Sequence, residues 1–322
     1  MEPLNFAVII PCYNEANNLL ELYQRLKNVA AELGDINLKI FFIDNKSEDE
    51  SLNIYGHLAK SDPNVHVVLM SRNFGSPQPS LLAGIRYAVQ QNVDAAVLMD
   101  ADLQDPPELI KEFVAKWHAG AQVVYGVRSK RDETFLRRLG YYIFYRIFRY
   151  FAFLDIPLDA GDFCLLDKIV LRHIAAFEET DVLIRGIRSW VGFKQEGVAY
   201  YRPIRKKGSS FFSLLDYVRV AKDAIVNFSD KPLEYISYLA VLSAIFTGIA
   251  SIGYLYIALT TTAPKGFFTL LMLILFFGTL QLLSLGVIAE YIIRIFREVK
   301  KRPPFIVQAV LRRNDDDTNE KK

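Results

Sequence analysis

Asp100 and Asp102 lie one residue apart, directly after the short apolar run of residues 96–99 and before Pro106 and Pro107. A short, continuously apolar run is typical of a strand buried on both faces of a parallel sheet, and open α/β sheets bind ligands at the carboxyl ends of such strands. In an extended segment both carboxylates would point the same way, which suits a divalent cation that carries a diphosphate. The pair therefore predicts a metal–nucleotide site, although an isolated pair of this kind is more often a solvated turn.

The N-terminal part of the chain alternates strand-like apolar runs with amphipathic helical patterns. The expected strands are residues 6–10, 38–43, 65–70, 95–99 and 123–127. Between the first two strands, apolar side chains recur at helical spacing, and the pattern ends near Gly34. Repeated units of this kind predict an α/β fold with a mainly parallel sheet and helices on both of its faces.

Two long apolar segments follow later in the chain, residues 235–259 and 267–289, and the only charged residue from 235 to 289 is Lys265. Each segment is long enough to cross a bilayer core of ~30 Å. The alternative is a buried hairpin, but nothing else in the chain is large enough to bury it. The segments therefore predict two transmembrane helices joined by a short loop.

Basic residues flank the outer ends of both apolar segments, whereas the connecting loop carries only Lys265. The flanking residues are Arg202, Arg205, Lys206, Lys207, Arg294, Arg297, Lys300, Lys301 and Arg302. By the positive-inside rule, both termini are expected in the cytosol. No cleavable signal is expected before the first strand. Because the positive charge follows the membrane ends, nucleic acid is not an expected partner, despite a net charge of +2.

The hydrophobic pattern divides the chain into several expected regions. They are a cytosolic catalytic domain (1–210), an amphipathic helix at the membrane surface (211–232), two transmembrane helices (233–296) with an external loop near 260–266, and a basic cytosolic tail with a disordered end (297–322). Chemistry is therefore expected in the first region, on the cytosolic side of the membrane.

Other features leave alternatives open or predict only packing. Residues 133–160 are rich in aromatic side chains and arginine, and form either a core helix with a cationic edge or a helix near the lipid headgroups. Cys12 and Cys164 have no spacing that suggests a metal site or a disulfide. Both are expected to be packing cysteines.

Short motifs occur in order at or beyond the expected strand ends. They are residues 11–15 (PCYNE), Asp44, residues 100–104 (DADLQ) and residues 161–163 (GDF). With them, the chain resembles the GT-A glycosyltransferases of family two. A narrower resemblance is to the polyprenyl-phosphate glycosyltransferases, relatives of dolichyl-phosphate mannose synthase. It adds residues 71–75 (SRNFG), 185–187 (RGI), 190–193 (WVGF) and 290–303, so that the motifs span roughly residues 5–308.

The resemblance implies roles for particular residues. Those implied to bind the nucleotide sugar are Pro11, Tyr13, Glu15, Asp44, Arg72 and Asp100. Those implied to hold Mg²⁺ or Mn²⁺ are Asp100, Asp102 and Gln104. Those implied to bind donor phosphate or lipid phosphate are Arg128, Arg137, Arg202 and Arg205. Asp162 would be the catalytic residue, beside the reacting centre.

The resemblance also implies a GT-A (Rossmann-like) fold and a reaction. That reaction is the metal-dependent, inverting transfer of a hexose from a UDP- or GDP-sugar to polyprenyl phosphate. UDP-glucose is the favoured donor and undecaprenyl phosphate the favoured acceptor, at the cytoplasmic face of the inner membrane, for glycosylation of the cell envelope. Relatives with two spans often form tetramers, so a homo-oligomer among membrane lipids is expected.

The proposed acceptor changes what Asp162 has to do. A phosphate monoester has a second pKa near ~6, so at cytosolic pH it is already largely a dianion. A strong general base is then unnecessary. Asp162 is therefore expected to orient the acceptor or to stabilise an oxocarbenium-like sugar rather than to remove a proton.

Some positions depart from the pattern of many relatives, which carry aspartate, arginine and lysine where this chain has Asn45, Cys164 and Phe211. The absence of two cations near the reacting phosphates could alter which sugar donor is used, or the activity itself. Arg205 and its neighbouring lysines could supply the missing charge. The alternatives are a family-two transferase with another lipid or glycan acceptor, and a noncatalytic membrane scaffold that binds nucleotide sugar. A transporter is disfavoured, because the apolar segments themselves carry no charge.

Overall fold

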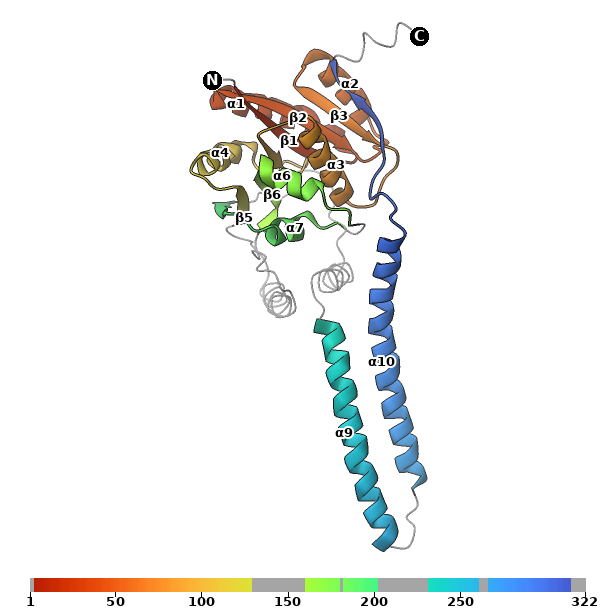
Figure 1. The fold of residues 1–322 in the computed structure, drawn as a ribbon. Coiled ribbons are helices and arrows are strands. Elements are labelled where there is room, and N and C mark those ends of the chain that lie inside the picture. Colours follow the sequence, from red (N-terminus) through yellow and green to blue (C-terminus); the bar gives the residue numbers. More distant parts are fainter. Residues whose placement is uncertain (1–2, 129–159, 180–181, 202–230, 261–265, 314–322) are drawn as a thin grey trace. The chain divides into compact units, whose positions relative to one another are not determined.

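The computed structural model describes residues 3–128, 160–179, 182–201, 231–260 and 266–313 (Figure 1). The chain forms two compact units. The first comprises residues 1–142, 154–211 and 303–322, and the second comprises residues 143–153 and 212–302. The first unit contains the sheet and the second contains two long helices.

The first unit is built on an eight-stranded sheet with the strand order β7-β5-β6-β4-β1-β2-β3-β8. The strands are β1 (Leu4–Cys12), β2 (Ile36–Asp44), β3 (Val65–Met70), β4 (Ala95–Leu98), β5 (Val123–Arg128), β6 (Ala160–Asp167), β7 (Gln195–Tyr200) and β8 (Val307–Leu311). Strands β4, β1, β2 and β3 are parallel, as are β5 and β7, whereas β6 and β8 run antiparallel to their neighbours. The predicted α/β class and all five predicted strands are confirmed.

Helices cover both faces of this sheet (Figure 1). One hydrophobic cluster involves α1 (Ala16–Leu33), α2 (Ser51–Ser61) and α4 (Ile110–His118). The other involves α3 (Pro77–Gln90), α6 (Lys168–Ala175) and α7 (Ile184–Trp190). Along β1 the side chains alternate between the clusters, with Phe6 and Val8 in one and Ala7 and Ile9 in the other. Burial on both faces explains why the strands read as continuous apolar runs.

Glycine is required where α3 crosses the sheet. A Cβ at Gly84 would overlap the side chain of Ile9 on β1 and press against Ile43 on β2. The helix therefore lies close to both strands. This close packing fixes the start of α3 beside the carboxyl ends of β1 and β2, where the candidate site lies.

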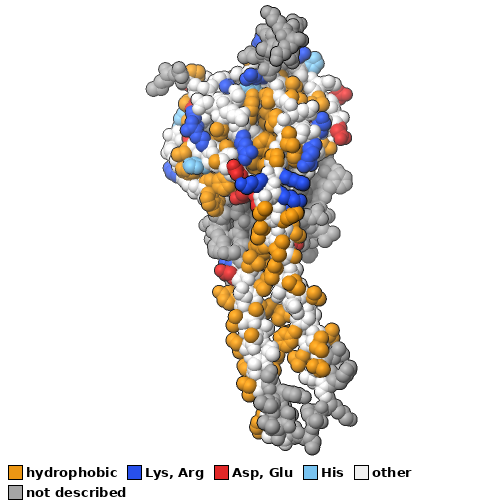
Figure 2. All heavy atoms as spheres, turned by 45° about the vertical axis from the view of Figure 1, so that its right-hand side comes forward, with side chains coloured by type: hydrophobic (Ala, Val, Ile, Leu, Met, Phe, Trp, Pro, Cys, Tyr) orange, Lys and Arg blue, Asp and Glu red, His pale blue; other side chains and the backbone are white. Residues whose placement is uncertain are grey.

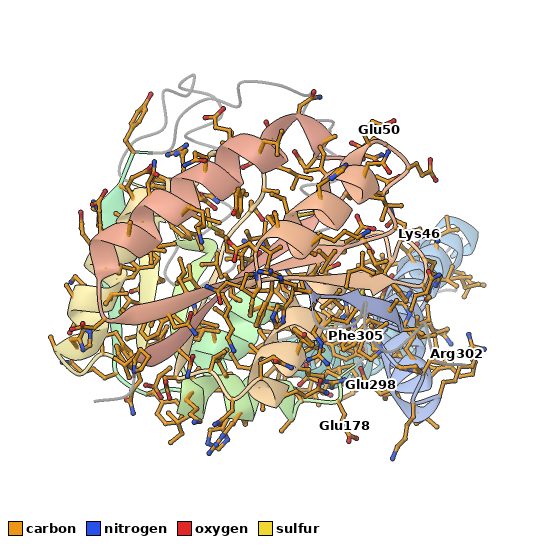
Figure 3. The ribbon with its side chains drawn as sticks, turned by 90° about the horizontal axis from the view of Figure 1, so that it is seen from above. Lys46, Glu50, Glu178, Glu298, Arg302 and Phe305 are labelled. Carbon is orange, nitrogen blue, oxygen red and sulfur yellow. The ribbon has the colours of Figure 1, made fainter. Side chains whose placement is uncertain are left out.

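Strand β8 lies in the region that the sequence predicts to be a cytosolic tail. It pairs antiparallel with β3, and Ser71 N donates to Ile306 O at 2.9 Å just beyond the paired residues. Phe305, labelled in Figure 3, packs against the α3 side of the core and lies 5.3 Å from the Arg86 guanidinium. Pairing covers an edge of β3 that would otherwise expose unpaired backbone groups.

The second unit contains α9 (Lys231–Thr260) and α10 (Phe267–Val299). Their most apolar segments, Lys231–Ala250 and Leu273–Val299, have mean hydropathies of 1.6 and 1.9 and no buried share. Figure 2 shows hydrophobic side chains exposed along this part of the molecule. By length and composition, both helices could cross a membrane. Two apolar helices were predicted here, and α10 continues past residue 289 to Val299.

Several sequence predictions concern residues outside the described ranges. The stretch 133–160 lies outside them except for Ala160, as does the predicted surface helix 211–232, except for the two residues that begin α9. The end of the tail, from residue 314 onward, is also outside them. The predicted boundaries of these regions therefore stay predictions.

Candidate functional site

A pocket of about 450 Å³ opens at the carboxyl ends of β1, β2 and β4. Its lining residues are Pro11, Cys12, Tyr13, Glu15, Asn45, Asn73, Gly75, Ser76, Pro77, Ser80, Asp100, Ala101 and Asp102. Strands β1, β2 and β3 follow one another across the sheet, whereas β4 lies on the other side of β1. The order in which successive strands are added to the sheet therefore reverses at β1. Ligands of open α/β sheets bind at such switch points.

The first wall of the pocket is the loop after β1, which is tied to the loop after β2. Asn45 N donates to Cys12 O at 2.8 Å, and Asn14 N donates to Ser47 Oγ at 3.0 Å. In return, Glu48 N donates to Asn14 Oδ1 at 2.8 Å. Asn14 has φ of 56°, a left-handed conformation that asparagine tolerates. These bonds fix the backbone that presents Tyr13 to the pocket.

Asp44 and Asn45 have different positions in the second wall. Asp44 is only 2% exposed, and its carboxylate accepts bonds from Ser47 N at 3.1 and 3.3 Å. Burial raises the pKa of this carboxyl, against the opposing effect of the Ser47 bonds. Asn45 lines the pocket, whereas Asp44 is not among its lining residues. The structure therefore places Asn45, the residue that departs from the pattern, in the pocket wall.

Asn45 also connects this wall to the loop after β3. Its Nδ2 donates to Asn73 Oδ1 at 3.1 Å, and its Oδ1 accepts from Phe74 N at 3.1 Å. An aspartate could accept the second bond but could not donate the first. The asparagine amide thus makes both bonds, whereas an aspartate at this position would make one of them.

Asp100 and Asp102 form the third wall and belong to a tightly held segment. Asp102 Oδ1 accepts from Gln104 N at 3.1 Å. Leu103, a buried residue, has φ of 61°, which is unusual for a bulky side chain and is a form of backbone strain found often at functional sites. Asp105 is buried and accepts a bond from the Tyr200 hydroxyl at 2.7 Å, which anchors the segment to β7.

The donor set in this wall suits a metal ion that arrives with a phosphate ligand. Among the described residues, no group of three or more His, Cys, Asp or Glu side chains is arranged to hold a metal. Two carboxylates, from Asp100 and Asp102, do face the pocket. Mg²⁺ is usually bound through one or two carboxylates together with substrate phosphates. The residues therefore fit an ion held jointly by the protein and a diphosphate. Gln104, the third predicted ligand, donates its backbone N–H to Asp102.

Asp162 lies near the beginning of β6, which pairs antiparallel with β4. The register pairs Leu98 with Cys164, so that Asp162 lies toward the same end of the sheet as Asp100. Asp162 Oδ2 accepts a bond from Gln78 Nε2 at 2.9 Å. Within the described part of the chain, its buried Oδ1 has no hydrogen-bond partner. The predicted catalytic carboxylate is thus held by one oxygen.

Two arginines approach the backbone next to Asp162. A Cβ at Gly161 would lie 2.7 Å from Arg128 Nη2, so a larger residue there would require the guanidinium to shift. Burial opposes the charge of Arg128, but the Tyr200 hydroxyl and the carboxylates of Asp105 and Asp100 outweigh it and raise the arginine pKa. Arg128 is therefore charged at the site, as its predicted role in phosphate binding requires.

The second arginine, Arg188 on α7, is fully buried. Its Nη1 donates to Gly161 O at 3.1 Å, and its guanidinium lies 5.0 Å from the centre of the Tyr125 ring. Burial raises the pKa of Cys164, and the nearby Arg188 opposes that effect. A guanidinium therefore lies beside the cysteine that stands where many relatives carry an arginine. Arg188 lies between residues 185–187 and residues 190–193, but belongs to neither motif.

Of the remaining predicted residues, only Arg72 lies in the described ranges, and it is not among the residues that line the pocket. Arg72 is exposed, donates to Asn73 O at 3.3 Å and lies 4.2 Å from the centre of the Phe74 ring. Arg137, Arg202, Arg205 and Phe211 lie outside the described residues. The pocket instead includes Ser76, Pro77 and Ser80 from the start of α3, which the sequence analysis did not name. Their signal was the Ser-Pro sequence after SRNFG, a typical helix start.

Several known proteins are similar to this chain in sequence. Residues 7–175 match the model of the family described as Glycosyl transferase family 2. The chain is 40% identical over 313 residues to the uncharacterized glycosyltransferase YkcC of Bacillus subtilis, covering 95% of this chain and 94% of that one. It is 33% identical over 315 residues to the prophage bactoprenol glucosyl transferase homolog of Escherichia coli K12, covering 95% and 99%. It is 34% identical over 319 residues to the bactoprenol glucosyl transferase of Shigella phage SfII, covering 97% and 100%.

Solved structures are more distant. The mannosyltransferase PcManGT from Pyrobaculum calidifontis, in complex with GDP-Man and Mn²⁺, is 15% identical with a TM-score of 0.43 and 88% coverage of each chain. The mannosyl-3-phosphoglycerate synthase from Rubrobacter xylanophilus is 15% identical with a TM-score of 0.43, covering 70% of this chain and 72% of that one.

Proposed function

Because this chain belongs to glycosyl transferase family 2, we propose that its pocket binds a nucleotide diphosphate sugar and that it transfers the hexose to polyprenyl phosphate. The observation that carries the proposal is the pair of carboxylates, Asp100 and Asp102, in the wall of a pocket at the carboxyl ends of β1, β2 and β4. Its volume of about 450 Å³ lies in the range of small-molecule sites. Relatives named bactoprenol glucosyl transferases favour glucose as the sugar and a polyprenyl acceptor.

In this proposal the walls formed by the loops after β1 and β2 hold the nucleoside. Pro11, Tyr13 and Glu15 line the pocket there and would contact it directly. Asp44 would act indirectly, because its carboxylate accepts bonds from the backbone of Ser47 and it is not among the residues that line the pocket. Arg72 lies outside the wall, so its contribution would be a long-range attraction for the donor phosphates.

Asp100 and Asp102 would hold Mg²⁺ or Mn²⁺ together with the donor diphosphate. When bound, the ion would stabilise the negative charge that develops on the leaving diphosphate. The Asp102 carboxylate is already oriented, because Gln104 N donates to its Oδ1 at 3.1 Å. Arg128 adds a cation on the side of Asp162, where its charge would attract donor or acceptor phosphate.

Asp162 would place the acceptor against the sugar. A phosphate monoester is largely dianionic at cytosolic pH, so its oxygen can attack without losing a proton to the enzyme. Attack from the face opposite the leaving diphosphate is a single displacement, and a sugar held in the α configuration would emerge β-linked. Asp162 would then orient the acceptor or stabilise positive charge on the sugar ring, and the rate would be flat from about pH 7 to 9.

The apolar helices fit a lipid acceptor. We place α9 and α10 across the cytoplasmic membrane, with the first unit and both termini in the cytosol, because basic residues follow α10 and the loop between the helices carries only Lys265. A polyprenyl phosphate keeps its head at the membrane surface and its tail in the lipid. Holding the transferase at that surface supplies the acceptor at high local concentration.

A transfer assay tests the function. Purified full-length protein in detergent would be given undecaprenyl phosphate, Mn²⁺ or Mg²⁺, and radiolabelled UDP- and GDP-sugars in turn. We expect label to reach the lipid from one donor, with UDP-glucose first, and Asp102→Asn to lower the rate by about 100-fold or more. Asp35→Asn is the matched control, since Asp35 is exposed and precedes β2 at the opposite end of that strand. If nucleotide binds but no donor reacts, the scaffold alternative replaces this proposal.

A further inference from the structure

We propose that Gln78 is the positioning residue that sets the orientation of the Asp162 carboxylate, and so decides which of its oxygens is presented for the reaction. The inference rests on the proposed role of Asp162. It concerns a residue outside every motif quoted above, in the first turn of α3.

The bonds of Gln78 allow only one orientation of its amide. Gln78 Nε2 donates to Asp162 Oδ2 at 2.9 Å, and Gln78 Oε1 accepts from Ile184 N at 2.8 Å. An ionised carboxylate can only accept a hydrogen bond and a backbone N–H can only donate one. Reversing the amide would therefore break both bonds at once. A single side chain thus joins α3, β6 and the first residue of α7.

The start of α3 is itself well fixed, which makes Gln78 a rigid support. Ser76 caps the helix, and its Oγ accepts from Gln78 N at 3.3 Å. Pro77 occupies the first helical position, where its fixed φ is already suited to a helix. Ser76 and Pro77 also line the pocket. Gln78 therefore connects the wall of the proposed donor site to the carboxylate on the acceptor side.

The opposite side of Asp162 is held through the backbone. Arg188 Nη1 donates to Gly161 O at 3.1 Å, so the peptide before Asp162 is fixed from α7 while its side chain is fixed from α3. With Oδ2 engaged by Gln78, the buried Oδ1 has no hydrogen-bond partner among the described residues. An unmet acceptor at this position is suited to a group that arrives with the substrates.

Within the described ranges, the charged and titratable groups near this segment include Arg128 from β5, Arg188 from α7 and Cys164 from β6. Gln78 is a neutral donor to the Asp162 carboxylate. Replacing the amide by a carboxyl of the same shape would make the bond to Asp162 depend on pH. Two adjacent carboxyls share a proton, and the pair loses it only at a raised pH.

Gln78→Glu is the test, because the introduced carboxyl could still accept from Ile184 N but could donate to Asp162 only while protonated. We expect kcat for transfer to undecaprenyl phosphate to be within about 3-fold of wild type near pH 6 and to fall by about 10-fold or more toward pH 8.5. The KM for the nucleotide sugar should stay unchanged and the wild-type profile should stay flat from about pH 7 to 9. Gln90→Glu is the matched control, since Gln90 is exposed at the other end of α3.

Gln78→Met keeps the test decisive if the first variant does not fold, as judged by its melting temperature. Methionine removes both bonds without adding charge, and we expect a kcat about 10-fold lower at every pH with unchanged donor KM. A Gln78→Glu profile that matches wild type, or a folded Gln78→Met enzyme with full kcat, overturns the positioning role. Full activity in Asp162→Asn would instead overturn the proposed role of Asp162, so the two failures are distinguishable.

Discussion

The two sides of the candidate site are held in different ways. The wall formed by the loops after β1 and β2 is fixed by bonds between neighbouring loops, such as Asn45 N to Cys12 O and Glu48 N to Asn14 Oδ1. The side around Asp162 is assembled from separate elements, with Gln78 from α3 and Arg188 from α7. Substitutions should therefore separate donor binding, which depends on the first side, from transfer, which depends on the second.

Removing the divalent ion should have the largest effect, because the ion would join Asp100 and Asp102 to the donor diphosphate. We expect EDTA to abolish transfer, since two carboxylates would then face the donor diphosphate with no intervening cation. Adding Mn²⁺ or Mg²⁺ should restore the wild-type rate but not the rate of Asp100→Asn. Rates in the transfer assay measure both. Undiminished transfer in EDTA would rule out a required metal.

Arg188→Met should have the next largest effect and should act on the second side alone. Arg188 is buried, and within the described residues its Nε and Nη2 have no hydrogen-bond partner, so methionine should leave the melting temperature unchanged or raise it. The Gly161 carbonyl would lose its donor, and we expect kcat to fall by about 10-fold.

The control for Arg188→Met is Arg172→Met, because Arg172 is exposed on the neighbouring α6. Melting temperature, donor binding and kcat should all match wild type in this control. A large loss of melting temperature with unchanged kcat in Arg188→Met would show that the arginine serves only the packing of α7.

Asp44→Asn should have the smallest effect, on the first side. Burial raises the pKa of Asp44, against the bonds from Ser47. For a carboxyl whose folded pKa is raised, the stability it contributes is full below the unfolded pKa and is lost as pH rises through the folded pKa. We therefore expect wild type to lose a few degrees of melting temperature relative to Asp44→Asn as the pH rises above about 4, the ordinary pKa of an aspartate. A difference of the opposite sign would contradict the direction of the pKa shift.

The same contrast explains how much of the molecule the sequence predicts. The strands of the first side and the pair Asp100–Asp102 follow from apolar runs and from residues at their ends, which are local patterns. The bond between Gln78 and Asp162 joins residues 84 apart in the chain, and the one between Ile184 and Gln78 joins residues 106 apart. No local pattern marks such pairs, because they form only when α3, β6 and α7 pack together.

Strand β8 illustrates a second limit. It is short, largely exposed and preceded by a basic, proline-containing segment, so composition indicates a tail. It pairs with the free edge of β3, and no sequence pattern indicates that these two segments are adjacent. Lys46, labelled in Figure 3, adds a contact of this kind from its Nζ to Gln308 Oε1 at 3.5 Å. Asn45 shows the opposite case, in which a residue marked as a departure turns out to connect two loops.

The most direct test of the account is to measure donor binding and transfer separately in Asp162→Asn. Calorimetry with Mn²⁺ and the nucleotide sugar that the wild-type enzyme uses would give Kd, and the lipid assay would give the rate. We predict a Kd within about 2-fold of wild type and a rate lowered by about 100-fold or more, because Asp162 lies outside the pocket wall that would hold the donor. A Kd that weakens as much as the rate, or a rate that does not change, would contradict the division of the site into a binding side and a transfer side.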